Sequence, residues 1–127
     1  ILDNASQRLQ GVALGRRDEE RAIMHRVSEW AADCPEETLN LVELAEVAGV
    51  SLRQLQQAFK AFTGMPPAHW LRLRRLNGAR RDLLRGGGVT VAEVAMRWSF
   101  WHLGRFSESY RQLFKEFPSE TLKRCRV

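Results

Sequence analysis

The chain has 127 residues, which is enough for one compact domain or two very small ones, and hydrophobic residues make up 44% of it. This composition excludes wholesale disorder, and no apolar run reaches the length of a membrane span. Leucine, alanine and arginine are abundant while isoleucine is rare, which favours helices over strands. Residues 1–50 carry a net charge of −5 and residues 51–127 a net charge of +10, so a surface for an acidic partner is expected in the second part.

The first residues, 1–17, show no sustained apolar periodicity and are expected to form a linker or a disordered end. From Asp18 to Cys34 apolar residues recur at helical spacing, and Pro35 is expected to end this helix. The two cysteines, Cys34 and Cys125, are far apart and lack the spacing of metal ligands, so we expect neither a disulfide framework nor a metal site. No signal peptide is visible, and these features together predict a cytoplasmic protein.

Two short helices joined by a tight turn are predicted next. Asn40 and Glu43 form a capping-box-like pair before an apolar stripe, and Gly49 is expected to end the helix. Ser51 begins the following helix, with Gln54 three places on as a second capping pair. The expected apolar positions of this helix are Leu52, Leu55, Ala58, Phe59 and Phe62.

A long helix is predicted from Pro66 and Pro67 to about Arg85, where Gly86 begins a run of three glycines that breaks it. Its buried stripe is expected to comprise Leu71, Leu76, Ala79 and Leu83. Arginines cover much of its remaining surface: Arg72, Arg74, Arg75, Arg80 and Arg81. Solvation is expected for most of the last four.

The pattern of capped short helices then recurs. Thr90 and Glu93 begin a short helix, and Ser99 and Phe100 form the turn after it. A longer helix is expected from near His102, and its inward positions are Phe106, Tyr110 and Leu113. A short final helix opens at Pro118 and Ser119.

The two halves can be superimposed as an internal repeat. At an offset of 50 positions Asn40, Glu43, Ala45, Gly49 and Val50 correspond to Thr90, Glu93, Ala95, Ser99 and Phe100. One extra residue then enters the second turn, and at an offset of 51 Leu55, Phe59, Lys60, Pro67 and Leu71 correspond to Phe106, Tyr110, Arg111, Pro118 and Leu122. Because many positions must agree at once, a repeat is a stronger signal than any single motif.

Each repeat has the pattern of a helix-turn-helix, whose second helix enters the major groove of DNA. We therefore predict an all-α fold of about seven helices, in which a first helix-turn-helix subdomain (18–66) and a second one (86–127) are joined by a linking helix (67–85). Two such units can present recognition helices about one DNA turn apart, roughly 34 Å.

These residues resemble the AraC/XylS family of transcription regulators. The stretch LAEVAGVSLRQLQQAFKAFTGMPPAHWL is similar to that family's first helix-turn-helix, and RLRRLNGARRDLL is similar to its central helix. The second unit, with its HLGRF and PSETL segments, is especially similar to the XylS branch. The resemblance covers about residues 20–126, nearly the whole chain.

The resemblance implies double-stranded DNA as the partner and transcription regulation as the function, with activation of an operon for the breakdown of a small molecule. Because the chain begins at Ile1, it is expected to be a fragment that lacks an N-terminal domain for effector binding or dimerisation. An activator must also touch RNA polymerase, which is a second expected partner.

Residues that contact DNA follow from the same resemblance. The expected base readers are Arg53, Gln56 and Gln57 in the first unit and Leu103, Gly104, Arg105 and Glu108 in the second. The alternative for Gln56 and Gln57 is an ordinary solvated helix face, and the alternative for Glu108 is to orient Arg105. The expected contacts to the DNA backbone are Ser51, Lys60, Arg74, Arg75, His102 and Arg111, although a capping role is nearly as plausible for His102. The tryptophans are expected to pack in or beside the core: Trp30, Trp70, Trp98 and Trp101. For Trp101, which lies at the turn, contact with DNA is the alternative.

Two positions depart from the family pattern. Ser99 replaces the usual glycine of the second turn, and Lys115 replaces a glycine that usually precedes the final proline. Each replacement costs about 1 kcal/mol if the position needs a positive φ.

Two other classes of function were weighed against DNA binding. Catalysis is not expected, because the three histidines are scattered and no nucleophile motif, phosphate loop or cofactor motif is present. A helical protein-interaction module is the alternative, and it would need an exposed apolar patch where this chain carries Arg53, Gln56 and Arg105.

Overall fold

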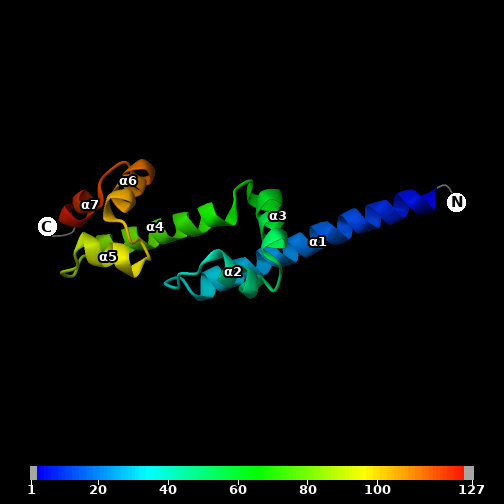
Figure 1. Ribbon diagram of the computed structural model, residues 1–127, viewed down its shortest axis with the longest axis horizontal. Helices are drawn as coiled ribbons and strands as arrows, with labels where there is room; N and C mark the ends of the chain where they lie inside the picture. The colour runs from blue at the N-terminus through cyan, green and yellow to red at the C-terminus, as the bar shows by residue number, and fades with distance from the viewer. Residues whose placement is uncertain (1–2, 125–127) are drawn as a thin grey trace. The chain divides into compact units, whose positions relative to one another are not determined.

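The computed structural model describes residues 3–124, with side chains from residue 15 onward, and within that range it contains only helices and no strand. The seven helices are α1 (Asp3–Asp33), α2 (Leu41–Ala48), α3 (Leu52–Thr63), α4 (Pro67–Arg85), α5 (Val91–Arg97), α6 (Leu103–Phe114) and α7 (Pro118–Arg124) (Figure 1). The all-α prediction is confirmed. The chain divides into two compact units between Trp70 and Leu71, so the boundary falls within α4. Cys125, about which a disulfide prediction was made, lies outside the described residues.

The first helix is longer than predicted. α1 begins at Asp3 rather than Asp18, so residues 3–17 are helical and not irregular. Most of these residues are alanine, leucine, glutamine or arginine, and none is proline. Such residues favour a helix without any apolar stripe, whereas the prediction relied on periodicity, which detects only a helix with one buried face.

Unit 1 packs α1 against α2 and α3. Its buried side chains are Ile23, Val27, Leu44, Ala45, Ala48, Leu55, Ala58 and Phe59. Arg26 of α1 donates from Nε to the carbonyl oxygen of Ala48 at 2.7 Å, which satisfies an unpaired carbonyl at the end of α2 with a cation. The Trp70 ring lies 5.5 Å from Phe59 and 6.4 Å from Trp30, so Trp30 and Trp70 extend this core as partly buried residues.

Unit 2 is built around the indole of Trp98, which is 1% exposed. An added Cβ on Gly78 would lie 2.3 Å from this ring, so glycine in the middle of α4 leaves the space that the indole fills. The indole Nε1 donates to a carboxylate oxygen of the buried Asp82 at 2.8 Å. The predicted apolar stripe of α4 is confirmed, since Leu71, Leu76, Ala79 and Leu83 are all buried.

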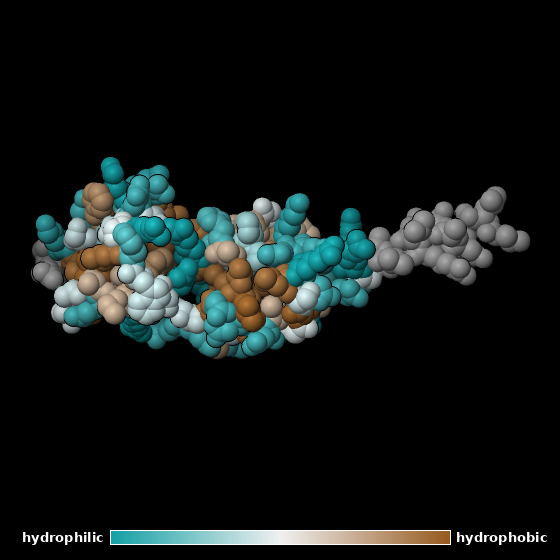
Figure 2. Space-filling model, in the orientation of Figure 1, coloured by the Kyte–Doolittle hydropathy of each residue, from teal (hydrophilic) through white to brown (hydrophobic). Residues whose placement is uncertain are grey.

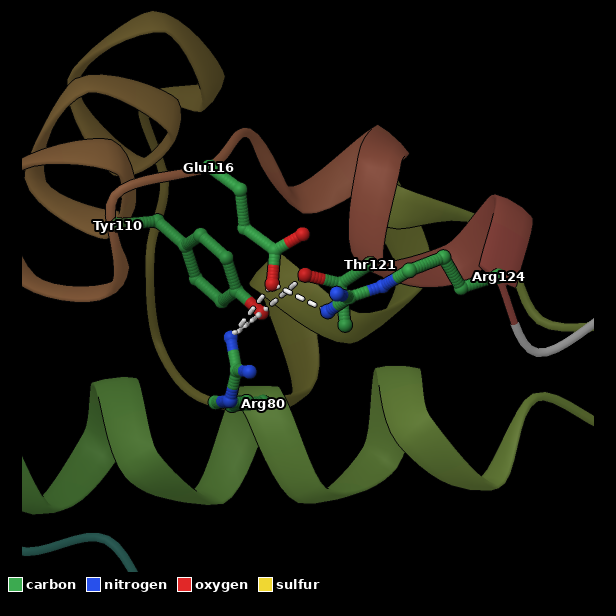
Figure 3. A network of polar contacts seen from close by, with 5 residues as sticks. All are labelled: Arg80, Tyr110, Glu116, Thr121 and Arg124. Carbon is green, nitrogen blue, oxygen red and sulfur yellow. Dashed lines mark hydrogen bonds and ion pairs between the residues drawn. The ribbon is translucent and has the colours of Figure 1, made fainter.

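A polar network connects α4, α6 and α7 within unit 2 (Figure 3). Arg80 donates to Glu116 at 3.1 Å and to the Tyr110 hydroxyl at 3.3 Å. The Tyr110 hydroxyl also bonds the Thr121 hydroxyl at 2.8 Å, and Arg124 donates to Glu116. Burial lowers the pKa of Arg80, but the hydrogen bond to Glu116 and the contact with Tyr110 raise it overall. Solvation, expected for most of the arginines of α4, therefore does not hold for Arg80, because Tyr110 and Phe114 on α6 and Glu116 between α6 and α7 contact its guanidinium.

The repeat inferred from the sequence is also present in the hydrogen bonds of the two turns. Val50 donates to the Ala45 carbonyl at 3.1 Å, and Phe100 donates to the Ala95 carbonyl at 2.9 Å. The residues before them have similar positive φ angles, 68° at Gly49 and 64° at Ser99. The turn after the second helix repeats as well, because Gly64 bonds back to Lys60 and Lys115 bonds back to Arg111. Both departures from glycine therefore fall where φ is positive.

Candidate nucleic-acid interface

The second helix of the first helix-turn-helix, α3, begins with a complete capping box. Ser51 Oγ accepts from the backbone N–H of Gln54 at 3.2 Å, and Gln54 Oε1 accepts from the backbone N–H of Ser51 at 3.0 Å. This confirms that Gln54 caps the helix. It also uses the Ser51 hydroxyl internally, so a phosphate contact by Ser51 would involve the same helix start rather than a free side chain.

The polar face of α3 carries the expected base readers. Arg53, Gln56 and Gln57 are all exposed, while Leu55, on the opposite side of the helix, is fully buried. The exposed side chains of this helix therefore offer guanidinium and amide groups, which match guanine and adenine edges in the major groove. Lys60 is exposed one turn beyond Gln56, and the two side chains line one concave surface.

The α1 helix contributes to the surroundings of this face. Arg53, Gln54 and Gln57 line one concave surface with Arg16, Glu19, Glu20 and Ile23 of α1. Two carboxylates therefore lie on the same surface as the arginine that is expected to read a base. The sequence does not indicate this proximity, because the helical spacing of α1 gives no information on which helix it packs against.

The second helix of the second helix-turn-helix, α6, is capped by a histidine. His102 Nδ1 accepts from the backbone N–H of Arg105 at 3.2 Å, so the capping role is confirmed. An added Cβ on Gly104 would lie 3.4 Å from Cε1 of the same imidazole, which is van der Waals contact, so the capping ring lies directly beside Gly104.

The remaining side chains at the start of α6 are open to solvent. Leu103, Arg105 and Glu108 are exposed, and Leu103 is 47% exposed although it is apolar. Further along the helix, Glu108 and Arg111 line one concave surface with Lys115. The Arg111 guanidinium lies 5.0 Å from the centre of the Phe117 ring and stays exposed.

The two arginines of α4 that were expected to contact the DNA backbone are only partly exposed. Arg75 donates to the carbonyl oxygen of Ser99 at 3.2 Å, and its guanidinium lies 4.8 Å from the centre of the Phe100 ring. Burial and the neighbouring Arg72 both lower the pKa of Arg75. Arg75 thus braces the second turn from within unit 2, and a DNA contact by Arg74 or Arg75 stays a prediction.

Trp101 does not pack as expected. Its side chain is 78% exposed, the highest value among the large hydrophobic residues that the structure describes. The prediction that it lies in or beside the core is wrong, because its neighbour Phe100 fills the inward position and stacks on Phe106 at 4.8 Å.

Comparison with known proteins identifies the family. Residues 44–124, more than half of the chain, match the sequence profile of a family described as "Helix-turn-helix domain". Over 103 residues the chain is 35% identical to the XylDLEGF operon transcriptional activator of Pseudomonas putida, an alignment that covers 80% of this chain and 32% of that protein. The chain belongs to the AraC/XylS family.

Solved structures of AraC-family domains have the same fold. A probable AraC family transcriptional regulator from Rhodopseudomonas palustris superposes with a TM-score of 0.72 at 31% identity, covering 84% of this chain and 99% of that one. The DNA-binding domain of AdpA, solved in complex with a target DNA, gives a TM-score of 0.64 at 29% identity, covering 79% of this chain and 89% of that one. The AraC/XylS chain described here is therefore a DNA-binding domain of a transcription regulator and not an enzyme.

Another relative shows how little of a whole regulator this AraC/XylS domain represents. The probable thc operon regulatory protein of Rhodococcus erythropolis is 40% identical over 90 residues, which are 69% of this chain and 27% of that protein. The chain thus spans a third or less of the length of these two curated relatives.

Among residues 3–124, no helix is long and apolar enough to cross a membrane, and no group of three or more potential ligand side chains could hold a metal ion.

Proposed function

We propose that the chain is the DNA-reading part of a transcription activator and that each unit places its second helix in the major groove of one operator segment. The supporting observation is the equivalence of α3 and α6. At an offset of 51, the N-cap residues Ser51 and His102 correspond, and both helices expose polar side chains on their first two turns. Two equivalent helices carried by one chain fit two adjacent groove segments about 34 Å apart.

The proposed base contacts are the exposed side chains at the start of each helix. Arg53 and Arg105 are suited to guanine, Gln56 and Gln57 to adenine, and Glu108 to cytosine. Leu103 is suited to a thymine methyl group, and Gly104 contributes through the close approach of the backbone. The proposed phosphate contacts are Ser51, Lys60, Arg74, Arg75, His102 and Arg111.

The regulatory context is proposed from the relatives. The Pseudomonas putida relative is a transcriptional activator of the XylDLEGF operon, and the Rhodococcus erythropolis relative is a probable operon regulator. By this likeness the chain activates an operon for the breakdown of a small molecule and acts in the cytoplasm, where the operon is. Its further partners are RNA polymerase and an effector or dimerisation domain on the N-terminal side.

Protein–protein interaction without specific DNA binding is less well supported. Hydrophobic residues gather over α2 in the space-filling view (Figure 2), and Val42 and Val47 of that helix are 61% and 37% exposed. This apolar surface belongs to α2, the first helix of the helix-turn-helix, whereas the exposed polar residues belong to α3, the second. It suits a contact with RNA polymerase in addition to DNA binding rather than in place of it.

The proposed base contacts are tested with two arginine variants and a charge-matched control. We expect Arg53→Ala and Arg105→Ala each to weaken binding to a duplex that the chain selects from a random pool by about 1–3 kcal/mol, with little change in thermal stability. Arg21→Ala removes an equal charge from an exposed position of α1 and should change affinity slightly and equally for selected and random duplexes. Fluorescence anisotropy at fixed salt measures all three. Wild-type affinity of both recognition variants for the selected duplex would contradict the assignment.

A further inference from the structure

Trp101 is the residue by which the second turn is longer than the first. Val50 corresponds to Phe100 and makes the same turn hydrogen bond, and Ser51 corresponds to His102 as the N-cap of the next helix. In unit 1 Ser51 directly follows Val50, whereas in unit 2 Trp101 lies between Phe100 and His102. Since unit 1 forms the turn and the cap without such a residue, the helix-turn-helix itself does not require this tryptophan.

The surroundings of Trp101 give it no packing role. The side chains on either side of it have other contacts. Phe100 packs at a tilt against Phe106, and the His102 imidazole lies against Gly104 at the start of α6. The His102 imidazole is turned onto α6 as its cap, whereas the neighbouring Trp101 side chain is 78% exposed. Within residues 15–124, whose side chains the structure describes, the Trp101 ring has no aromatic or cation–π contact.

We propose that Trp101 contacts the sugar–phosphate backbone of DNA beside the groove that α6 enters. This inference rests on the proposed function of α6 and extends it to a residue outside the helix. Trp101 precedes the N-cap by one residue and, like Leu103 and Arg105, which are proposed to face the bases, is exposed. An indole combines an apolar face that covers a deoxyribose with an N–H that donates to a phosphate oxygen.

The expected signature is a loss of affinity that depends neither on base sequence nor on salt. Removing the ring by Trp101→Ala should weaken binding about tenfold, because apolar surface would no longer be covered. Trp101→Phe should retain most of the affinity. The ratio of affinities for selected and random duplexes of about 30 base pairs, three helical turns, should stay that of the wild type. The slope of affinity against salt should also stay unchanged, since a neutral ring displaces no counterion.

The experiment measures these affinities by anisotropy for the whole 127-residue chain, with Leu84→Ala as the control. Leu84 is an exposed apolar residue of unit 2, 46% exposed on α4, and its removal should leave DNA affinity unchanged. Thermal unfolding should show wild-type stability for Trp101→Ala and Leu84→Ala. The difference in tryptophan fluorescence between the wild type and Trp101→Phe is the emission of the Trp101 ring. Bound DNA should reduce the quenching of this emission by acrylamide.

Each other outcome overturns the proposal in a distinguishable way. If Trp101→Ala binds both duplexes as the wild type does, the ring does not touch DNA, and its exposed face is left for a protein partner. If affinity falls for the selected duplex alone, the ring reads bases instead of the backbone. If the wild type itself selects no duplex, the proposed function fails, and this inference fails with it.

Discussion

The two helix-turn-helix units form equivalent turns with different means. In unit 1 the residues with positive φ are glycines, Gly49 and Gly64, and every buried polar or charged side chain among the described residues lies in the other unit. In unit 2 the equivalent positions are Ser99 and Lys115, with φ of 64° and 63°. The comparison shows that glycine eases this turn but does not define it, because the same backbone hydrogen bonds form with serine in its place.

Both turns have an arginine bonded to a carbonyl oxygen, Arg26 to Ala48 in unit 1 and Arg75 to Ser99 in unit 2, but unit 2 adds a buried indole beside its strained turn. The indole of Trp98 fills the space left by Gly78 and bonds Asp82, and Arg75 donates to the Ser99 carbonyl. A left-handed conformation costs a non-glycine residue about 1 kcal/mol, and a single satisfied hydrogen bond contributes a similar amount. These contacts are therefore sufficient to offset the strain at Ser99.

The largest expected effect comes from filling the space beside Trp98. Gly78→Ala places a Cβ within 2.3–2.6 Å of three indole atoms, and Asp82 holds the ring from the other end. We expect a loss of about 3 kcal/mol in the free energy of unfolding, confined to unit 2 and seen by residue-resolved hydrogen exchange. Gly15→Ala is the matched control, since nothing lies within 4 Å of its added Cβ, and it should instead stabilise α1 by about 0.5–1 kcal/mol. A stable Gly78→Ala variant would show that Trp98 is not fixed in this way.

The next largest effect concerns the polar network of unit 2. Tyr110 corresponds to Phe59, which is buried in unit 1 without any hydroxyl. Tyr110→Phe should cost about 1–2 kcal/mol in urea unfolding, because it leaves the Thr121 hydroxyl and Arg80 each short of a partner. In the Tyr110→Phe variant, the further change Thr121→Val should lower the free energy of unfolding much less than Thr121→Val lowers it in the wild type. Both ends of the hydrogen bond are then apolar. Strictly additive losses would mean that the two hydroxyls do not stabilise the unit jointly.

The smallest expected effect is an exchange of residues between the two turns. Gly49→Ser should destabilise unit 1 by about 1 kcal/mol, because its added Cβ meets nothing within 4 Å and only the positive φ opposes it. Ser99→Gly should stabilise unit 2 by up to about 1 kcal/mol, and Lys115→Gly by less, since it also removes a cation from the C-terminal end of α6. Thermal unfolding measures all three. Equal stability of Gly49→Ser and the wild type would contradict a strain of this size.

Much of the fold could be predicted because the relevant signals are local. Capping pairs such as Asn40 with Glu43 and Ser51 with Gln54 form as predicted, and the repeat found in the sequence is reproduced in the turn hydrogen bonds. The periodicity of apolar residues predicted burial less reliably near the ends of helices. Phe62 and Leu113, expected inside and equivalent at an offset of 51, are 47% and 39% exposed.

The rest could not be predicted because it depends on tertiary contacts. Nothing in the sequence around Gly78 indicates that an indole from the next helix fills its place. For the same reason the partners of Arg75 and Arg80 were missed, since an arginine on a helix surface has the same local pattern whether it is solvated or bonded. The exposure of Trp101 was missed because tryptophan is usually at least partly buried.

Selection of duplexes from random DNA by the chain, at physiological salt, tests the central claim most directly. The account predicts two enriched motifs whose centres are about 10 base pairs apart, one for each unit. The same selection with Arg53→Ala should weaken the base preference within one motif, and the selection with Arg105→Ala should weaken it within the other. No enrichment by the wild type, with binding that vanishes as salt rises, would contradict it and leave only a non-specific basic surface.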